Sequence, residues 1–71
     1  MIVIKCMVGS LAGHFIGFDE RGICFRVHLS CAWAFTSRES AAEVLRIYAH
    51  IGHLDKSKYS ILDYSLCCSP L

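Results

Sequence analysis

The chain has 71 residues, of which 55% are hydrophobic and 18% are charged, and its net charge is +1 with the histidines neutral. This length predicts one domain, residues 1–71, and the composition is too apolar for a disordered chain. A near-neutral charge argues against a strongly basic nucleic-acid binder and against an acidic imitator of DNA. The apolar surplus predicts exposed apolar surface, which favours contact with a partner or a second copy of the chain.

The termini and the cysteines indicate where the protein works. No apolar run approaches the roughly 18 residues that a bilayer-spanning helix needs, and the first residues lack the pattern of a secretory signal. We therefore expect a cytoplasmic protein with no membrane contact. There the cysteines would remain reduced thiols, with Cys6, Cys24 and Cys31 as small buried apolar groups and Cys67 and Cys68 near the chain end.

Most of the chain has the pattern of short strands. Apolar and β-branched residues predict strands over residues 2–8, 14–18, 23–29 and 59–66, with a polar hairpin turn at residues 19–22 and a short extended segment at residues 32–35. Alternation in the third strand places two sets of side chains on opposite faces. One set is Ile23, Phe25, Val27 and Leu29, and the other is Cys24, Arg26 and His28.

A single amphipathic helix follows residue 35. Thr36 and Glu39 have the spacing of a reciprocal N-terminal cap, and Gly52 is suited to the C-terminal stop. The apolar stripe with helical spacing consists of Ala41, Val44, Leu45, Tyr48 and Ile51. The order strand, strand, strand, helix, strand predicts an α+β fold: an antiparallel sheet of about four strands with the helix packed on one face and the other face open.

No residues are predicted to be catalytic or to bind a cofactor or a metal. The histidines and cysteines lack the spacing of a zinc site. Cys24 and His28 share a strand face, but four residues along a strand span about 13 Å, too far for a nucleophile and its base. We therefore expect a protein that is not an enzyme.

Contact with a partner is the favoured function, through the open sheet face, the stripe of Arg26 and His28, the outer face of the helix and the loop at residues 55–58. The candidate partner-binding residues are Arg21, Arg26, His28, Arg38, Arg46, Lys56 and Lys58. A second possibility is a small nucleic-acid-binding or regulatory protein that stacks bases on Trp33 beside Arg26 and His28. A third is a homodimer formed through the apolar surplus.

The layout also resembles that of small proteins encoded by phages and other mobile elements. The residues that carry the resemblance are the hairpin at 18–22, the start of the helix at 34–42 and the return to the last strand at 54–61. Within that group the chain is similar to anti-CRISPR inhibitors. This resemblance implies a protein that evades host defence in the bacterial cytoplasm, by binding a CRISPR effector complex or its nuclease and blocking DNA recognition or cleavage. The near-neutral charge departs from the acidic inhibitors that imitate DNA, and no functional residue carries over.

Overall fold

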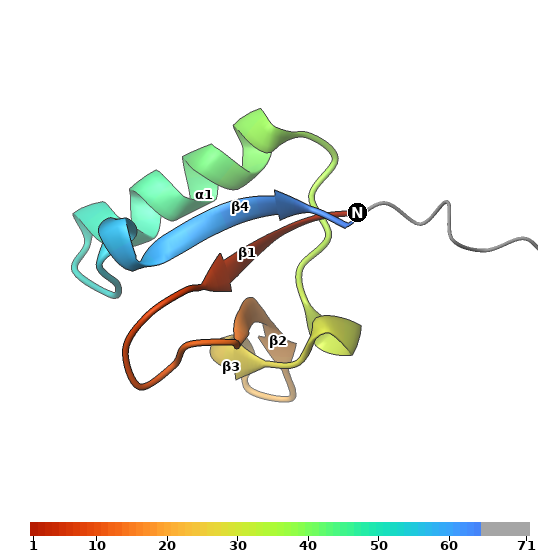
Figure 1. The fold of residues 1–71 in the computed structure, drawn as a ribbon, viewed down its shortest axis with the longest axis horizontal. Coiled ribbons are helices and arrows are strands. Elements are labelled where there is room, and N and C mark those ends of the chain that lie inside the picture. The colour runs from red at the N-terminus through yellow and green to blue at the C-terminus, as the bar shows by residue number, and fades with distance from the viewer. Residues whose placement is uncertain (65–71) are drawn as a thin grey trace, which may run out of the picture.

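The computed structural model describes residues 1–64 of the chain. Its elements are β1 (Ile2–Cys6), β2 (Phe15–Asp19), β3 (Gly22–Val27), α1 (Arg38–His50) and β4 (Tyr59–Asp63), with short 3₁₀ turns η1 (Leu29–Cys31) and η2 (Lys56–Lys58). The four strands form one antiparallel sheet in the order β3-β2-β1-β4, and α1 runs alongside β1 and β4 on one face (Figure 1). The predicted α+β architecture and element order are confirmed.

The strand boundaries differ from prediction where the chain turns early. β1 ends at Cys6 rather than residue 8, and the side chains of Met7 and Val8 are about half exposed. β3 ends at Val27 because the chain then turns into η1. The predicted last strand is present as β4, and its expected residues 65 and 66 lie outside the described range.

The turn between β2 and β3 forms where the sequence predicts it. Asp19 pairs with Gly22 across the hairpin, and its Oδ1 accepts a hydrogen bond of 2.8 Å from the backbone N–H of Arg21. Gly22 has a φ of +115°, a conformation that residues with a Cβ rarely adopt. The aspartate at position 19 and the glycine at position 22 are thus explained by the turn.

Helix α1 begins one residue later than predicted. The N-cap is Ser37, not Thr36, and Ser37 Oγ accepts a hydrogen bond of 3.1 Å from the backbone N–H of Ser40. The predicted reciprocal pairing with Glu39 is therefore wrong. Both hydroxyl residues suit an N-cap, and the extended backbone at Ser37 (φ −153°, ψ 161°) decides between them.

The predicted stop at Gly52 is confirmed. Gly52 has a φ of +85° and donates a hydrogen bond of 3.2 Å to the carbonyl of Ala49. The next residue, His53, donates one of 3.0 Å to the carbonyl of Tyr48. These two bonds are the Schellman pattern, which satisfies the last carbonyls of a helix and favours glycine at the left-handed position.

A β-bulge changes which face of the sheet the side chains at the end of β3 point toward. Phe15 pairs with Val27 but Gly17 pairs with Cys24, so β3 has one more residue than β2 over this stretch. The extra residue reverses the alternation. Phe25 packs on the helix side and Val27 on the other side, which corrects the prediction that the two share a face.

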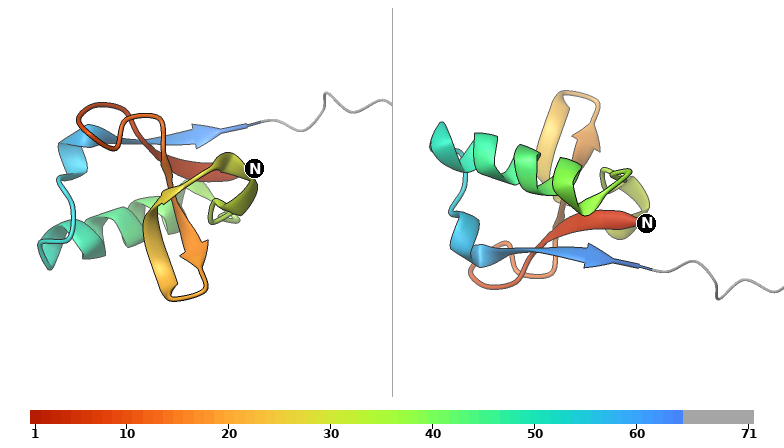
Figure 2. Two further views of the ribbon diagram at one scale, coloured as in Figure 1. Left: turned by 90° about the horizontal axis from the view of Figure 1, so that it is seen from below. Right: turned by 90° about the horizontal axis from the view of Figure 1, so that it is seen from above.

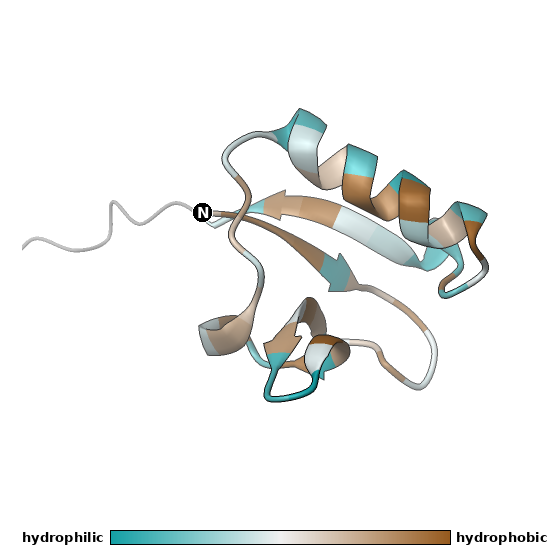
Figure 3. Cartoon of the chain, turned by 180° about the vertical axis from the view of Figure 1, so that it is seen from behind, coloured by the Kyte–Doolittle hydropathy of each residue, from teal (hydrophilic) through white to brown (hydrophobic). Residues whose placement is uncertain are grey.

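The main core lies between α1 and the sheet. Its buried members come from β1, β2, the extended segment before the helix, and the helix itself: Ile4, Ile16, Phe35, Ala41 and Leu45. Figure 2 shows the helix crossing the sheet on this side from two directions, and Figure 3 shows hydrophobic bands on α1 and on the strands. Burial of these side chains supplies most of the stabilisation available to a chain of this size.

The segment from Ala32 to Phe35 lies between β1 and β2. The two strands pair directly only around Lys5 and Phe15. Beyond that point the backbone N–H of Trp33 donates to the carbonyl of Ile16 at 2.9 Å, and that of Phe35 donates to the carbonyl of Ile2 at 2.8 Å. The predicted extended segment is therefore present, as two isolated bridges that join the separating strands.

The face of the sheet away from α1 is not open, contrary to prediction. It holds a second buried cluster of Val3, Phe15 and Val27, with exposed fractions of 0%, 6% and 8%. Ala32 packs on this cluster after the chain leaves η1, and Leu62 and Tyr64 pack on it from the β4 side. The path of residues 28–32 thus covers part of the surface that the helix leaves bare.

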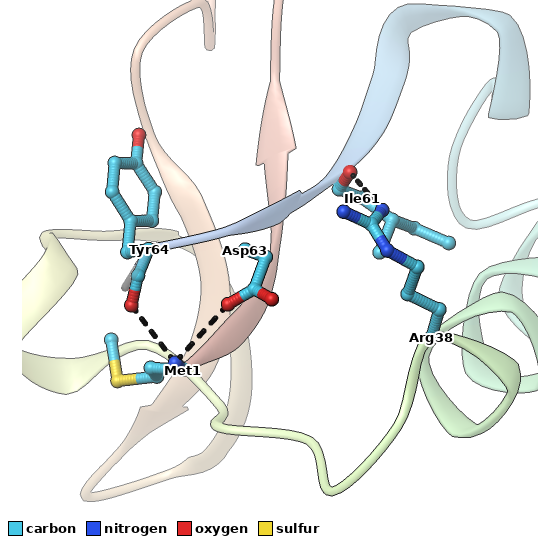
Figure 4. A network of polar contacts seen from close by, with 5 residues as sticks. All are labelled: Met1, Arg38, Ile61, Asp63 and Tyr64. Atoms are coloured by element: carbon cyan, nitrogen blue, oxygen red, sulfur yellow. Dashed lines mark hydrogen bonds and ion pairs between the residues drawn. The ribbon is translucent and has the colours of Figure 1, made fainter. Parts of the chain in front are cut away.

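Three polar contacts hold β4 in place, two at its C-terminal end and one at its middle residue (Figure 4). The ammonium of Met1 lies 2.9 Å from the carbonyl of Tyr64 and 3.4 Å from a carboxylate oxygen of Asp63. On the outer edge of β4, Arg38 Nη1 donates to the carbonyl of Ile61 at 3.3 Å. Because β4 is an edge strand, this guanidinium satisfies a carbonyl that would otherwise be open to another chain.

Candidate functional site

The apolar side of α1 is wider than the core requires. With about 100° per residue, Ile51 and Ile47 lie roughly 120° and 160° around the helix from the buried Leu45, on the side of Tyr48. The exposed fractions are 56% for Ile51 and 43% for Ile47, so the prediction of Ile51 as a core residue is wrong. The helix therefore has two aliphatic side chains in solvent on one flank.

This flank faces the β2–β3 hairpin. The rings of Tyr48 and Phe25 are in edge contact, with centroids 5.9 Å apart. Ile23 and Phe25 from the hairpin and Val44 from the helix are half-buried and pack on the same core cluster. We group their exposed portions with Ile47 and Ile51, which the helical angles place on the same flank, as one candidate apolar surface.

The aromatic side chains at the far end of the hairpin extend the exposed apolar surface. Phe18 is 49% exposed, and its ring centroid lies 4.9 Å from that of Trp33. Trp33 in turn stacks on the buried Phe35, with centroids 4.6 Å apart. Trp33 is thus half-buried against the core, and Phe18 is the outermost of the three rings. We define the helix–hairpin surface as the set Phe18, Ile23, Phe25, Val44, Ile47 and Ile51.

The seven predicted partner-binding residues lie on several separate elements. All are exposed: Arg21 in the hairpin turn, Arg26 and His28 in and after β3, Arg38 and Arg46 on α1, and Lys56 and Lys58 in η2. Arg38 binds the edge of β4, and Arg46 forms an ion pair with Glu43. They do not form one basic cluster.

The exposure of Ile47 and Ile51 was not predicted from the sequence. Helical spacing predicts an apolar stripe, but it does not reveal how much of that stripe the core covers.

A small cavity of about 180 Å³ opens at one end of the sheet. It lies between the loop that follows β1 and the connection from α1 to β4, and it is lined by Cys6, Val8, Gly9, Ser10, Leu11, His53, Leu54, Asp55, Lys58 and Tyr59. Among these, Cys6 is buried and its Sγ donates to the carbonyl of Val8 at 3.1 Å. The thiol is therefore already engaged with an acceptor that cannot act as a base.

Two ionisable groups of the cavity, Tyr59 and Asp55, have pKa shifts that oppose nucleophilic chemistry. Burial, with the nearby Cys6 thiol, raises the pKa of Tyr59 above its usual value of 10.0, so the phenol remains neutral. Hydrogen bonds from the side chain and backbone of Ser57 lower the pKa of Asp55 below 3.8. Asp55 Oδ1 accepts both bonds, at 2.7 and 3.0 Å, as the cap of η2. Its carboxylate thus has a structural role.

The cysteines and histidines are dispersed in the described part of the chain. Cys6 is buried as predicted and Cys24 is half-buried, but Cys31 is exposed, contrary to prediction, because it ends the surface turn η1. Cys67 and Cys68 lie outside the described residues. Within residues 1–64 no group of three or more histidine, cysteine or acidic residues is arranged to hold a metal ion.

Over the same residues, no helix is both long and apolar enough to cross a membrane. Comparison with known proteins found no matching family, no matching curated protein and no matching solved structure.

Proposed function

We propose that this protein acts by binding another protein through the helix–hairpin surface, without catalysing a reaction. The observation that carries the proposal is the exposure of Phe18, Ile47 and Ile51, at 49%, 43% and 56%, around half-buried apolar neighbours. Apolar side chains arranged in this way contribute to affinity when a partner removes them from water. A ring and two aliphatic chains beside half-buried aromatics match the composition of a protein interface centre.

The specific form of the proposal is an inhibitor of the anti-CRISPR type, acting in a bacterial host cytoplasm on a CRISPR effector complex or its nuclease. Its support is the resemblance of the hairpin, helix start and final strand to small mobile-element proteins. The near-neutral charge and the helix–hairpin surface favour blocking by shape and apolar contact over imitation of DNA. The basic residue Arg21, in the turn that follows β2, would lie at the rim of such a contact.

Two measurements test these statements separately. The first is a phage-plaquing assay in hosts with active CRISPR systems, in which the expressed protein is expected to restore infection in at least one system. The second is capture of binding partners from those hosts with the purified chain, comparing the wild type with Ile47→Arg and Ala42→Arg. Ala42 is exposed on the other flank of α1, so Ala42→Arg adds the same charge away from the proposed surface.

The expected result is loss of both restored infection and partner capture in Ile47→Arg, with at least about a tenfold decrease in affinity, and retention of both in Ala42→Arg. If Ile47→Arg abolishes capture of a partner but the wild type restores infection in no host, the proposed CRISPR inhibition is refuted. The proposed protein binding through the helix–hairpin surface is then retained. Equal capture by Ile47→Arg and the wild type would refute the helix–hairpin surface itself. RNA or DNA as the captured species would favour the nucleic-acid alternative.

A further inference from the structure

A pair of histidines meets at the open end of the hairpin, away from the helix–hairpin surface. His14 precedes β2 and His28 follows β3. Because Phe15 pairs with Val27, the next position outward places His14 opposite His28. Their ring centroids are 5.9 Å apart, with an angle of 35° between the ring planes.

One of these rings forms a hydrogen bond with a backbone carbonyl. His14 Nδ1 lies 3.2 Å from the carbonyl of Leu11. A carbonyl oxygen only accepts, so this hydrogen bond requires the proton on Nδ1, and in the neutral ring the lone pair is then on Nε2. A ring N–H donated to a backbone carbonyl is the arrangement by which proteins orient histidines that bind metals.

The spacing of the rings is close to that of two imidazoles on one ion. With metal–nitrogen bonds of about 2.0–2.1 Å and a tetrahedral angle, the two centroids would be about 5 Å apart. His28 is exposed, so a small rotation of its side chain can close the remaining difference. Arg26, two residues before His28, is also exposed, and its charge is screened by water.

We propose that His14 and His28 together bind a divalent transition-metal ion that prefers imidazole, such as Ni²⁺ or Zn²⁺. This chain supplies two nitrogen ligands, and water completes the coordination. The site is independent of the proposed protein-binding function, because neither histidine belongs to the helix–hairpin surface.

Ni²⁺ is the probe of choice because the chain also contains thiols, which bind Zn²⁺ strongly. Isothermal titration with Ni²⁺ is expected to show one site per chain, and paramagnetic broadening in NMR spectra is expected first at the ring signals of His14 and His28. Each of His14→Ala and His28→Ala should weaken binding by at least about tenfold. His50→Ala removes an exposed helix histidine and is expected to leave the affinity unchanged.

Absence of Ni²⁺ binding by the wild type would overturn the proposal. Binding that is equally strong in His28→Ala, or broadening centred on other residues, would also overturn it. Circular dichroism of each variant checks that a lost site is not a lost fold, and the wild-type NMR measurement locates the ion without any substitution.

Discussion

Substitution of Gly17 by alanine is expected to separate β2 from the chain at Cys31 and Ala32, where the segment between β1 and β2 begins. A Cβ on Gly17 would lie 2.2 Å from the carbonyl oxygen of Cys31, 2.7 Å from Cγ2 of Val27 and 3.0 Å from Cα of Ala32. Two of these three atoms are backbone, so a change of side-chain rotamer cannot relieve the contact. The chain at Cys31 and Ala32 must move away from β2.

The expected cost follows from steric overlap alone. The φ of Gly17 is not positive, so alanine adds no backbone strain there. Overpacking costs about 1–3 kcal/mol, and a 2.2 Å approach to a backbone atom belongs at the upper end. The reduced entropy of the unfolded chain offsets about 0.4–1 kcal/mol. The net loss is then about 2–2.6 kcal/mol, a large part of the stability of a domain this small, which is on the order of 5 kcal/mol.

Urea unfolding measures this loss, with Trp33 as the fluorescent probe because it is the chain's only tryptophan. For a slope of about 1 kcal/mol per molar urea, the midpoint should fall by about 2–2.6 M. Gly22→Ala is the control: nothing lies within 4 Å of its Cβ, but its φ of +115° costs about 1–2 kcal/mol. A midpoint for Gly17→Ala equal to the wild type, or above that of Gly22→Ala, would refute the close packing described for Gly17.

Three further outcomes are expected. Ser37→Ala should destabilise the fold by about 1 kcal/mol, since it removes the N-cap, while Thr36→Ala should have a much smaller effect in the same urea titration; the reverse order would restore Thr36 as the cap. Gly52→Ala should cost about 1–2 kcal/mol because its φ is +85°, and an unchanged thermal midpoint would contradict the Schellman assignment. The pKa of Asp55 is lowered in the folded state, so its carboxylate stabilises the fold above pH 3.8 and this contribution disappears as the pH falls through the folded pKa. The stability difference between the wild type and Asp55→Asn should therefore shrink below pH 3.8, and a difference that grows there would contradict the assigned sign.

Features determined by neighbouring residues were predictable from the sequence. The turn at Asp19–Gly22 and the helix stop at Gly52 each depend on a backbone conformation that glycine adopts and on hydrogen bonds within a few residues. The order of elements followed from the same local patterns. The observed N-cap is one residue after the predicted one. Thr36 and Ser37 both have a hydroxyl that can cap a helix, and only the backbone angles distinguish them.

Features determined by distant contacts were not predictable. The bulge depends on the pairing register between β3 and β2, which the alternation within β3 cannot reveal. Because of the bulge, the side chain of Val27 lies in the second cluster. Exposure of Ile51 depends on how much of the helix circumference the rest of the protein covers, which helical spacing alone does not reveal. The histidine pair likewise required the hairpin register, because His14 and His28 are separated by the whole hairpin in sequence.

The position of Trp33 and Phe35 between β1 and β2 has a consequence for motion. Direct pairing of the two strands is confined to one end, so the hairpin and the β1–α1–β4 part would otherwise be free to swing about that end. The hydrogen bonds that the backbone N–H groups of Trp33 and Phe35 donate to β2 and to Ile2 must both break before the two parts can separate. Hydrogen exchange at these two amides should accordingly require opening of the whole molecule and proceed at the slowest rates in the chain.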